Sequence, residues 1–225
     1  MPTCLANQNI ESLLHELLQE GGVRPSGELI TNLRVYIEEL HSWNQHTNLT
    51  GLKTMEEMAV KHVGDTLTLI RVLPEDVHHV LDIGTGPGVP GFILKLFCPD
   101  LEIVLVDAVR KKVSFLNTMI AKIGLTGIRA EHCRVSPKDI PGHSPPEGFD
   151  IIVSQAAGPL DELARMAGPL MSANGLVIAM KGPGMNEKLK REIGCLQRHG
   201  WETSIIKTQT PVGSFRRNLI MLRKC

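Results

Sequence analysis

The stretch of residues 80–91, Val-Leu-Asp-Ile-Gly-Thr-Gly-Pro-Gly-Val-Pro-Gly, constrains the fold more than any other part of the chain. It begins as an apolar run typical of a strand, places four glycines within eight residues, and leads directly into the helix-like apolar run 92–97. A glycine loop in this position leaves backbone N–H groups open to a ligand, because no Cβ atom covers them. The loop also directs the positive end of the helix dipole towards that ligand. The stretch therefore predicts a site for a cofactor that contains a nucleoside.

After residue 77, short apolar runs typical of strands alternate with helical runs, and the connections between them are short. This alternation predicts an α/β fold, in which helices cover both faces of a mostly parallel sheet. The predicted strands are 80–83, 102–106, 127–131, 149–153, 176–180, 202–207 and 218–222, and the predicted helices are 90–97, 109–123, 160–171 and 185–199. We expect the last strand to enter antiparallel, because only the polar stretch 208–217 precedes it and no helix intervenes.

The first part of the chain has a different pattern, in which apolar residues recur at helical spacing. We predict helices over 9–20, 26–43 and 54–72, the third beginning with a capping box formed by Thr54 and Glu57. We therefore expect residues 1–75 to form a helical extension packed on the core. Residues 76–225 are expected to form the cofactor-binding domain as a single compact unit.

The composition of the chain gives information about its compartment and its binding partners. The chain has 24 lysine and arginine residues and 24 aspartate and glutamate residues. Net charge is therefore no argument that the protein binds nucleic acid, and no argument against a local basic patch. The five cysteines are scattered, which indicates reduced thiols, and no stretch reads as a secretion signal or a membrane span. His62 and Asp65 share a helix face, but no further ligand joins them at metal-binding spacing. We expect a cytoplasmic monomer that binds no metal and no membrane.

Asp82 indicates which cofactor the loop binds. The spacing Gly84-x-Gly86-x-Gly88 differs from the Gly-x-Gly-x-x-Gly pattern of nicotinamide-binding loops. A carboxylate next to the loop suits a cofactor with a cationic amino-acid moiety, whereas it would repel a pyrophosphate. This favours S-adenosyl-L-methionine. Alternatively, Asp82 accepts hydrogen bonds from loop amides and shapes the turn, and the two roles can coexist.

Asp107 ends the second predicted strand, 23 residues after Gly84. An acidic residue at this place accepts hydrogen bonds from the ribose hydroxyls of a bound nucleoside. Alternatively, it caps the helix that begins near residue 109. Arg110, Lys111 and Lys112 follow directly, and they either contact RNA phosphates or form a solvated helix end.

Three further segments follow strands whose carboxyl ends face the same edge of the sheet, where substrates meet cofactors. Backbone groups of Val135 and Ser136, after the third strand, are placed to line an adenine pocket. Gln155 follows the fourth strand. Lys181 ends the fifth strand, where it either contacts substrate or is an ordinary surface charge.

Taken in order, these segments resemble the RsmG family, also called GidB, of bacterial 16S ribosomal RNA guanine-N7 methyltransferases. The resemblance spans nearly the whole chain, and the ordered set is specific where each motif alone is modest. The motifs that carry it are Trp43-Asn44 with Asn48-Leu49-Thr50, Glu57-Met58, Lys61-His62-Val-Gly-Asp65, Asp82 to Gly91, Asp107 with Lys111-Lys112, Phe149-Asp150 with Val153-Ser154, and Lys181-Gly182.

The resemblance implies a class I methyltransferase, with a Rossmann-like, mostly parallel seven-stranded sheet whose last strand is antiparallel. It implies methyl transfer from S-adenosyl-L-methionine to N7 of a guanine in 16S rRNA or the small ribosomal subunit. The expected cofactor contacts are Asp82, Gly84, Thr85, Gly86, Gly88, Val89, Asp107, Val135, Ser136 and Gln155. The expected RNA contacts are Lys61, Arg110, Lys111, Lys112, Arg216 and Arg217. Because guanine N7 has a free lone pair, we expect no general base, and His62, Lys181 and Gln155 are candidates for positioning.

The sequence departs from the family at two positions. Gln155 and Lys61 stand where the family usually has arginine. Neither side chain reproduces the bidentate geometry of a guanidinium. The departure at residue 155 leaves open an RNA-binding or ribosome-binding protein of this fold without turnover. A second alternative is a methyltransferase for a small molecule, with the N-terminal helices as a lid over the substrate.

Overall fold

The computed structural model describes residues 9–135, 142, 144–155, 158–184 and 187–225. In these residues seven strands form one sheet: β1 (His79–Ile83), β2 (Glu102–Asp107), β3 (Ile128–His132), β4 (Phe149–Gln155), β5 (Met171–Lys181), β6 (Trp201–Gln209) and β7 (Arg216–Lys224). The strand order is β3-β2-β1-β4-β5-β7-β6. Neighbouring strands from β1 to β5 pair in parallel, whereas β7 is antiparallel to both β5 and β6. This confirms the predicted mostly parallel sheet with an antiparallel last strand.

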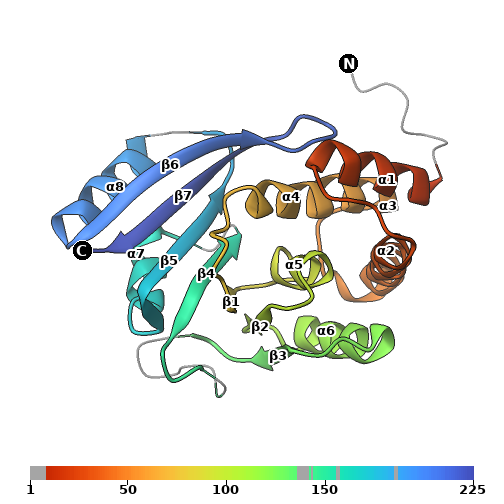
Figure 1. The fold of residues 1–225 in the computed structure, drawn as a ribbon, viewed down its shortest axis with the longest axis horizontal. Helices are drawn as coiled ribbons and strands as arrows, with labels where there is room; N and C mark the ends of the chain where they lie inside the picture. The colour runs from red at the N-terminus through yellow and green to blue at the C-terminus, as the bar shows by residue number, and fades with distance from the viewer. Residues whose placement is uncertain (1–8, 136–141, 143, 156–157, 185–186) are drawn as a thin grey trace.

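Helices cover both faces of the sheet (Figure 1). Their bounds are α1 (Ile10–Gly21), α2 (Gly27–Thr47), α3 (Met55–Met58), the π-helix η1 (Ala59–Val63), α4 (Gly64–Ile70), α5 (Gly91–Phe97), α6 (Arg110–Ile123), α7 (Leu160–Ala167) and α8 (Glu187–Arg198). Figure 1 shows α7 and α8 on one side of the sheet and the helices from α1 to α6 on the other.

Side chains of the central strands alternate between two hydrophobic clusters, one on each face. In β2, Ile103 and Leu105 join the cluster under α1 to α6, whereas Val104 and Val106 join the cluster under α7 and α8. All four side chains are buried. A strand buried on both faces must be apolar at successive positions, which explains the uninterrupted apolar runs in the sequence.

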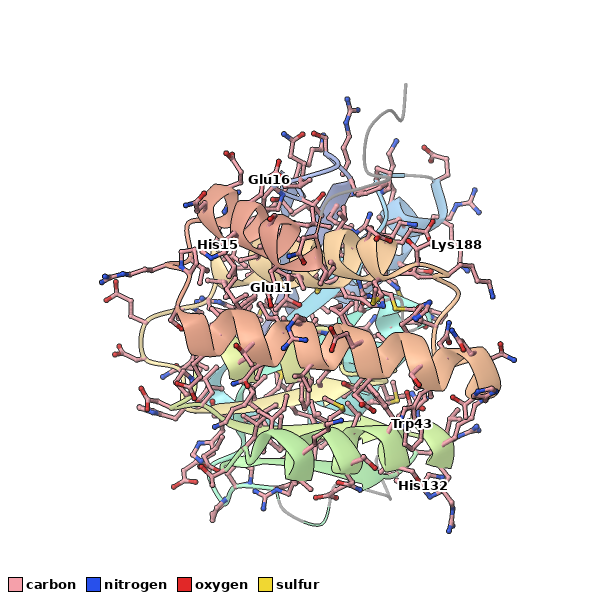
Figure 2. The ribbon with its side chains drawn as sticks, turned by 90° about the vertical axis from the view of Figure 1, so that its right-hand side faces the viewer. Glu11, His15, Glu16, Trp43, His132 and Lys188 are labelled. Carbon is pink, nitrogen blue, oxygen red and sulfur yellow. The ribbon has the colours of Figure 1, made fainter. Side chains whose placement is uncertain are left out.

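The N-terminal helices share the hydrophobic cluster of the first sheet face. Tyr36 of α2 is fully buried and stacks on Phe92 of α5, with ring centroids 5.2 Å apart. Its hydroxyl donates a hydrogen bond to the carbonyl oxygen of Pro87 in the glycine loop, at 3.0 Å. Figure 2 shows Trp43 at the end of α2 next to α6, where its ring meets Phe115 edge-on at 5.6 Å. The division of the chain at residue 75 into extension and domain stays a prediction.

The third predicted helix is interrupted. Its capping box is confirmed, since the Thr54 side chain accepts from the Glu57 amide and the Glu57 carboxylate accepts from the Thr54 amide. Five residues of the span are π-helical, however, and this segment, η1, carries Lys61 and His62. Short π-helical segments often occur at functional sites.

Several other boundaries differ from the predicted ones. The helix predicted over 160–171 ends at Ala167, because Pro169 has no N–H with which to continue it. The hairpin of β6 and β7 is longer than predicted, since strand pairing continues through polar residues up to Gln209 and Arg216. In the described ranges, no helix is both long enough and apolar enough to span a lipid bilayer.

Candidate functional site

The glycine loop lies between β1 and α5, at the carboxyl ends of the parallel strands. The amides of Gly84 and Thr85 both donate to the carbonyl oxygen of Val106, at 2.9 and 3.0 Å, which ties the loop to the end of β2. The amides of Gly88 and Val89 in turn donate to the carbonyl oxygen of Thr85, both at 2.9 Å. These four bonds hold the loop in one shape against the neighbouring strand.

Gly88 and Gly86 of the loop have different structural roles, one in packing and one in leaving room for a ligand. A Cβ atom on Gly88 would lie 2.6 Å from Cβ of Phe92 and 2.7 Å from Cδ2 of Leu116, so this glycine allows the loop to pack on α5 and α6. Gly86 has φ +61°, and the nearest atom to its missing Cβ is the oxygen of Gly84 at 4.0 Å. Gly86 is buried and its amide is bonded to Asp107, but the space where a Cβ atom would stand is unfilled, which leaves room for a ligand against the backbone.

Asp82 supports the loop from inside the protein. It is fully buried, and its Oδ2 accepts hydrogen bonds from the Thr85 hydroxyl at 2.7 Å and the Gly91 amide at 2.8 Å. Its Oδ1 has no hydrogen-bond partner among the residues whose positions are described. Burial raises the pKa of Asp82 to about 7, although both hydrogen bonds oppose this shift and Asp107 adds to it. These hydrogen bonds agree with the alternative in which Asp82 shapes the turn. Contact between Asp82 and the cofactor stays a prediction.

The raised pKa of Asp82 predicts a pH-dependent stability. The folded protein holds this proton more tightly than the unfolded chain does, so the stabilisation is present in acid and is lost as pH rises through about 7. We expect Asp82 to lower the free energy of unfolding by about 2 kcal/mol between about pH 5 and pH 7. Asp82→Asn keeps an acceptor oxygen for Thr85 and Gly91 but cannot titrate, so this part of the decrease should vanish in urea unfolding curves. Parallel pH profiles for the two proteins would contradict the assignment.

Asp107 links the glycine loop to α6. Its Oδ2 accepts from the Gly86 amide at 2.9 Å and from Nζ of Lys112 at 3.3 Å, and its Oδ1 accepts from the Val109 amide at 2.8 Å. Asp107 is buried, whereas Arg110 and Lys111 at the start of α6 are exposed. The structure thus holds the carboxylate directly beside the bare backbone of Gly86. Lys112 is engaged with this carboxylate rather than free.

Of the two residues expected near the adenine, Val135 and Ser136, the structure describes Val135. Val135 is buried in the hydrophobic cluster under α7 and α8. Ser136 lies outside the described residues.

A second group of polar side chains meets where α4 approaches the ends of β4 and β7. Asp65 is almost fully buried, with 2% of its surface exposed. Its Oδ2 accepts from Nε2 of Gln155 at 2.6 Å and from Nη2 of Arg217 at 3.2 Å, and its Oδ1 forms an ion pair with Nε of Arg217 at 2.8 Å. Burial raises the pKa of Asp65, and the Arg217 guanidinium opposes that shift. We call these three residues the Asp65 cluster.

The cluster joins residues that the sequence placed in separate roles. Gln155 was expected at the cofactor and Arg217 at the RNA, and the structure connects both through Asp65. The remaining terminal nitrogen of Arg217, Nη1, donates to the carbonyl oxygen of Arg216. The guanidinium of Arg217 is therefore engaged inside the protein. The sequence signals for Asp65 were the helix face that it shares with His62 and the motif Lys61-His62-Val-Gly-Asp65.

His62 and Lys61 lie on η1, one turn before Asp65. His62 is buried, and its Nε2 has no hydrogen-bond partner within the described part of the chain. Burial lowers the pKa of His62 to about 4, so the imidazole is neutral at pH 7. Nζ of Lys61 lies 5.5 Å from the ring centroid of Phe215, in the loop between β6 and β7. Among residues with described positions, no three His, Cys, Asp or Glu side chains gather as metal ligands.

Lys181 lies at the end of β5. Its Nζ donates to the carbonyl oxygen of Gly158 at 2.6 Å, and burial lowers its pKa. It lines a cavity of about 350 Å³ between the end of β5 and the start of α8, together with Gly158, Gly182, Gly184, Lys188, Leu189 and Glu192. Lys181 is thus oriented across the carboxyl ends of β4 and β5.

Comparison with known proteins agrees with this geometry. The family described as GidB, rRNA small subunit methyltransferase G, matches residues 29–220, which include the N-terminal helices from α2, the glycine loop and the Asp65 cluster. The chain belongs to this family.

Relatives that bear the name ribosomal RNA small subunit methyltransferase G match over most of their length. The protein from Geobacter sulfurreducens is 36% identical over 214 residues, which cover 93% of this chain and 97% of the relative. The protein from Desulforamulus reducens is 35% identical over 191 residues, covering 84% and 79% of the two chains. Among solved structures, the ribosomal protein L11 methylase of Lactobacillus delbrueckii subsp. bulgaricus has a TM-score of 0.54 and 18% identity, covering 72% of this chain and 78% of that one. That likeness concerns the fold alone.

As a GidB-family chain, the protein has glutamine at position 155, where the resemblance implied arginine. The structure nevertheless contains a guanidinium beside this position, since Arg217 of β7 reaches the same carboxylate oxygen that binds Gln155. An ionised carboxylate only accepts hydrogen bonds, so the amide nitrogen of Gln155 must face Asp65. The amide oxygen of Gln155 then faces away from Asp65 and is an acceptor, whereas arginine offers only donors.

Proposed function

We propose that this protein methylates N7 of a guanine in 16S ribosomal RNA, with S-adenosyl-L-methionine as the methyl donor. Membership of the GidB family carries the proposal, because the match extends over the glycine loop and the N-terminal helices alike. The acceptor is the 16S rRNA or the small ribosomal subunit, which would place the protein in the cytoplasm.

The residues around the loop fit S-adenosyl-L-methionine. The bare backbone at Gly86 leaves room that a Cβ atom would fill. The Asp107 carboxylate beside it is suited to accept hydrogen bonds from ribose hydroxyls, and the buried Val135 is suited to an adenine face. The buried Oδ1 of Asp82, which no described residue bonds, adds an acceptor with unused capacity below the loop. We assign the cofactor to this edge of the sheet, with Gly84, Thr85, Gly88, Val89 and Gln155 as further contacts.

Methyl transfer to guanine N7 requires no general acid or general base from the protein. When bound, S-adenosyl-L-methionine supplies a methyl group on a sulfonium, which is an activated leaving group. Guanine N7 has a free lone pair and no proton to remove, so the protein has to orient the base and exclude water. The neutral imidazole of His62, the amide of Gln155 and the ammonium of Lys181 are the side chains that we assign to positioning.

A single substitution separates cofactor binding from folding. Gly86→Ala places a methyl group in the open space beside the loop, and φ +61° adds a strain of about 1–2 kcal/mol. We expect the affinity for S-adenosyl-L-methionine, measured by calorimetry, to fall about tenfold or more, which corresponds to about 1.4 kcal/mol. Gly124→Ala is the matched control, since Gly124 has φ +78° with no atom within 4 Å and lies at the far end of α6. Equal affinities of the two variants would exclude the loop backbone as the binding surface.

The methylation itself is tested by mapping N7-methylguanosine in 16S rRNA from cells with and without the gene. We expect a modified guanine to disappear on deletion, and to return when purified protein and S-adenosyl-L-methionine are added to the unmodified small subunits. An unchanged map would refute the proposed reaction.

A further inference from the structure

A row of polar side chains crosses the antiparallel end of the sheet. In the register of these strands, Lys181 of β5 pairs with Asn218 of β7, which pairs with Lys207 of β6. Directly paired residues on neighbouring strands project from the same face of a sheet. Arg216 lies two residues before Asn218 on β7 and so projects from this face as well. One face therefore gathers three cationic side chains from three strands.

The register also separates the two neighbouring arginines. Arg217 projects from the opposite face, where it reaches Asp65 of α4. Arg216 is exposed on the face of α7 and α8, to which Ile220 and Leu222 of the same strand also project. Consecutive residues of a strand point to opposite faces, so a pair that looks uniformly basic in sequence has one internal and one external member.

Part of this face is hollowed into a groove, and no acidic side chain is among the described residues that line it. A groove of about 460 Å³ is lined by Pro183, Lys207, Thr208, Gln209, Arg216, Arg217 and Asn218. Asn218 is buried and donates to the carbonyl oxygen of Gly182 at 3.0 Å, which fixes the segment between this groove and the Lys181 cavity. Of the three cations lining the groove, Arg217 is neutralised by Asp65. Lys207 and Arg216 are exposed and form no ion pair with a described carboxylate.

We infer that this groove binds the phosphodiester backbone of a single-stranded segment of the acceptor RNA, next to the nucleotide that enters the site. The inference rests on the proposed function. Phosphates are recognised by exposed lysine and arginine side chains, and the exposed amide of Gln209 suits the sugar and phosphate oxygens. The segment is single-stranded because a base has to leave its stack before an enzyme can modify it.

The positions of the cationic side chains in this row indicate the path of the RNA segment across the sheet. Strands of a sheet lie about 4.8 Å apart, so Lys181 and Lys207, two strands apart, are separated by about 10 Å and contact different phosphates. Lys181 bonds to Gly158, just beyond β4, and so marks the end of the row nearest the site. Arg216 and Lys207 mark its outer end. The acceptor strand thus runs from the carboxyl ends of β4 and β5 outwards across β7 and β6.

The test compares two charge-matched variants. Lys207→Gln with Arg216→Gln removes two cations from the groove, and Arg223→Gln with Lys224→Gln removes two exposed cations from the other end of β7. Binding of a fluorescein-labelled single-stranded oligouridylate is measured by anisotropy between about 50 and 200 mM salt. We expect the groove variant to bind about tenfold more weakly, with a salt slope reduced by about 1.4 for two lost phosphate contacts. The control variant should follow the wild-type protein, and all three should bind S-adenosyl-L-methionine equally.

Two results would overturn the inference. One is an RNA affinity of the groove variant that equals that of the control, and the other is an equal loss in both variants, which would indicate general charge attraction. Methylation of unmodified small subunits by the wild-type protein is measured in parallel. Failure of that reaction refutes the proposed function, while the oligouridylate titration still decides whether the groove binds RNA.

Discussion

Replacing Arg217 by methionine is expected to lower the free energy of unfolding by about 3–5 kcal/mol. The substitution leaves the buried Asp65 carboxylate without its cationic partner, and Gln155 alone does not compensate a charge. Urea unfolding followed by circular dichroism measures the effect. Arg216→Met is the matched control, because the adjacent side chain is exposed and its loss should change stability by no more than about 0.5 kcal/mol.

A second variant distinguishes a lost charge partner from lost packing. Asp65→Asn combined with Arg217→Met removes both charges, so most of the lost stability should return. The deficit of Arg217→Met alone should shrink in acid. Removing the guanidinium raises the pKa of Asp65 further, so in acid the folded variant binds a proton at Asp65 and no buried charge is left without a partner. As pH rises this proton is lost and the free energy of unfolding falls. A deficit that is independent of pH and persists in the double variant would show that Arg217 acts through packing alone.

Gly88→Ala is expected to lower the free energy of unfolding by about 2–5 kcal/mol, through backbone strain and overpacking together. The new Cβ atom would lie 2.6 Å from Cβ of Phe92, a backbone-attached atom that cannot move without shifting α5. The residue also has φ +105°, which side chains rarely adopt. Thermal and urea unfolding measure the loss, and S-adenosyl-L-methionine binding should fall with it because the loop is displaced.

Comparing Gly88→Ala with Gly86→Ala distinguishes a glycine needed for packing from a glycine needed for ligand binding. Both substitutions lie in the same loop at positive φ, but only the Cβ atom at Gly88 would meet atoms closer than 3 Å. We therefore expect Gly88→Ala to reduce mainly the stability of the fold and Gly86→Ala to reduce mainly the affinity for the ligand. Stability losses of the same size in the two variants would contradict the distinction between a packing glycine and a binding glycine.

Features formed by residues close in sequence were predicted well. The strand, glycine loop and helix around Asp82 were predicted from one stretch, because apolar periodicity and glycine spacing are local signals. The same holds for the capping box of Thr54 and Glu57. The π-helical form of η1 was missed, since its residues fit a helical pattern of either kind.

The α/β class, the glycine loop at the sheet edge and the acidic residues Asp82 and Asp107 beside it could all be predicted from the order of the amino acids. Each of these depends on side-chain alternation or on spacing within a strand–loop–helix unit, so a chain of this pattern has few other ways to bury its apolar residues. The meeting of Asp65, Gln155 and Arg217 could be found in the folded protein alone. Gln155 and Arg217 lie 90 and 152 residues after Asp65, and the strand order brings them together. The folded structure also shows which arginine of the pair 216–217 turns inwards. That choice follows from the register of β7 against β5 and β6, which one residue of slip would reverse.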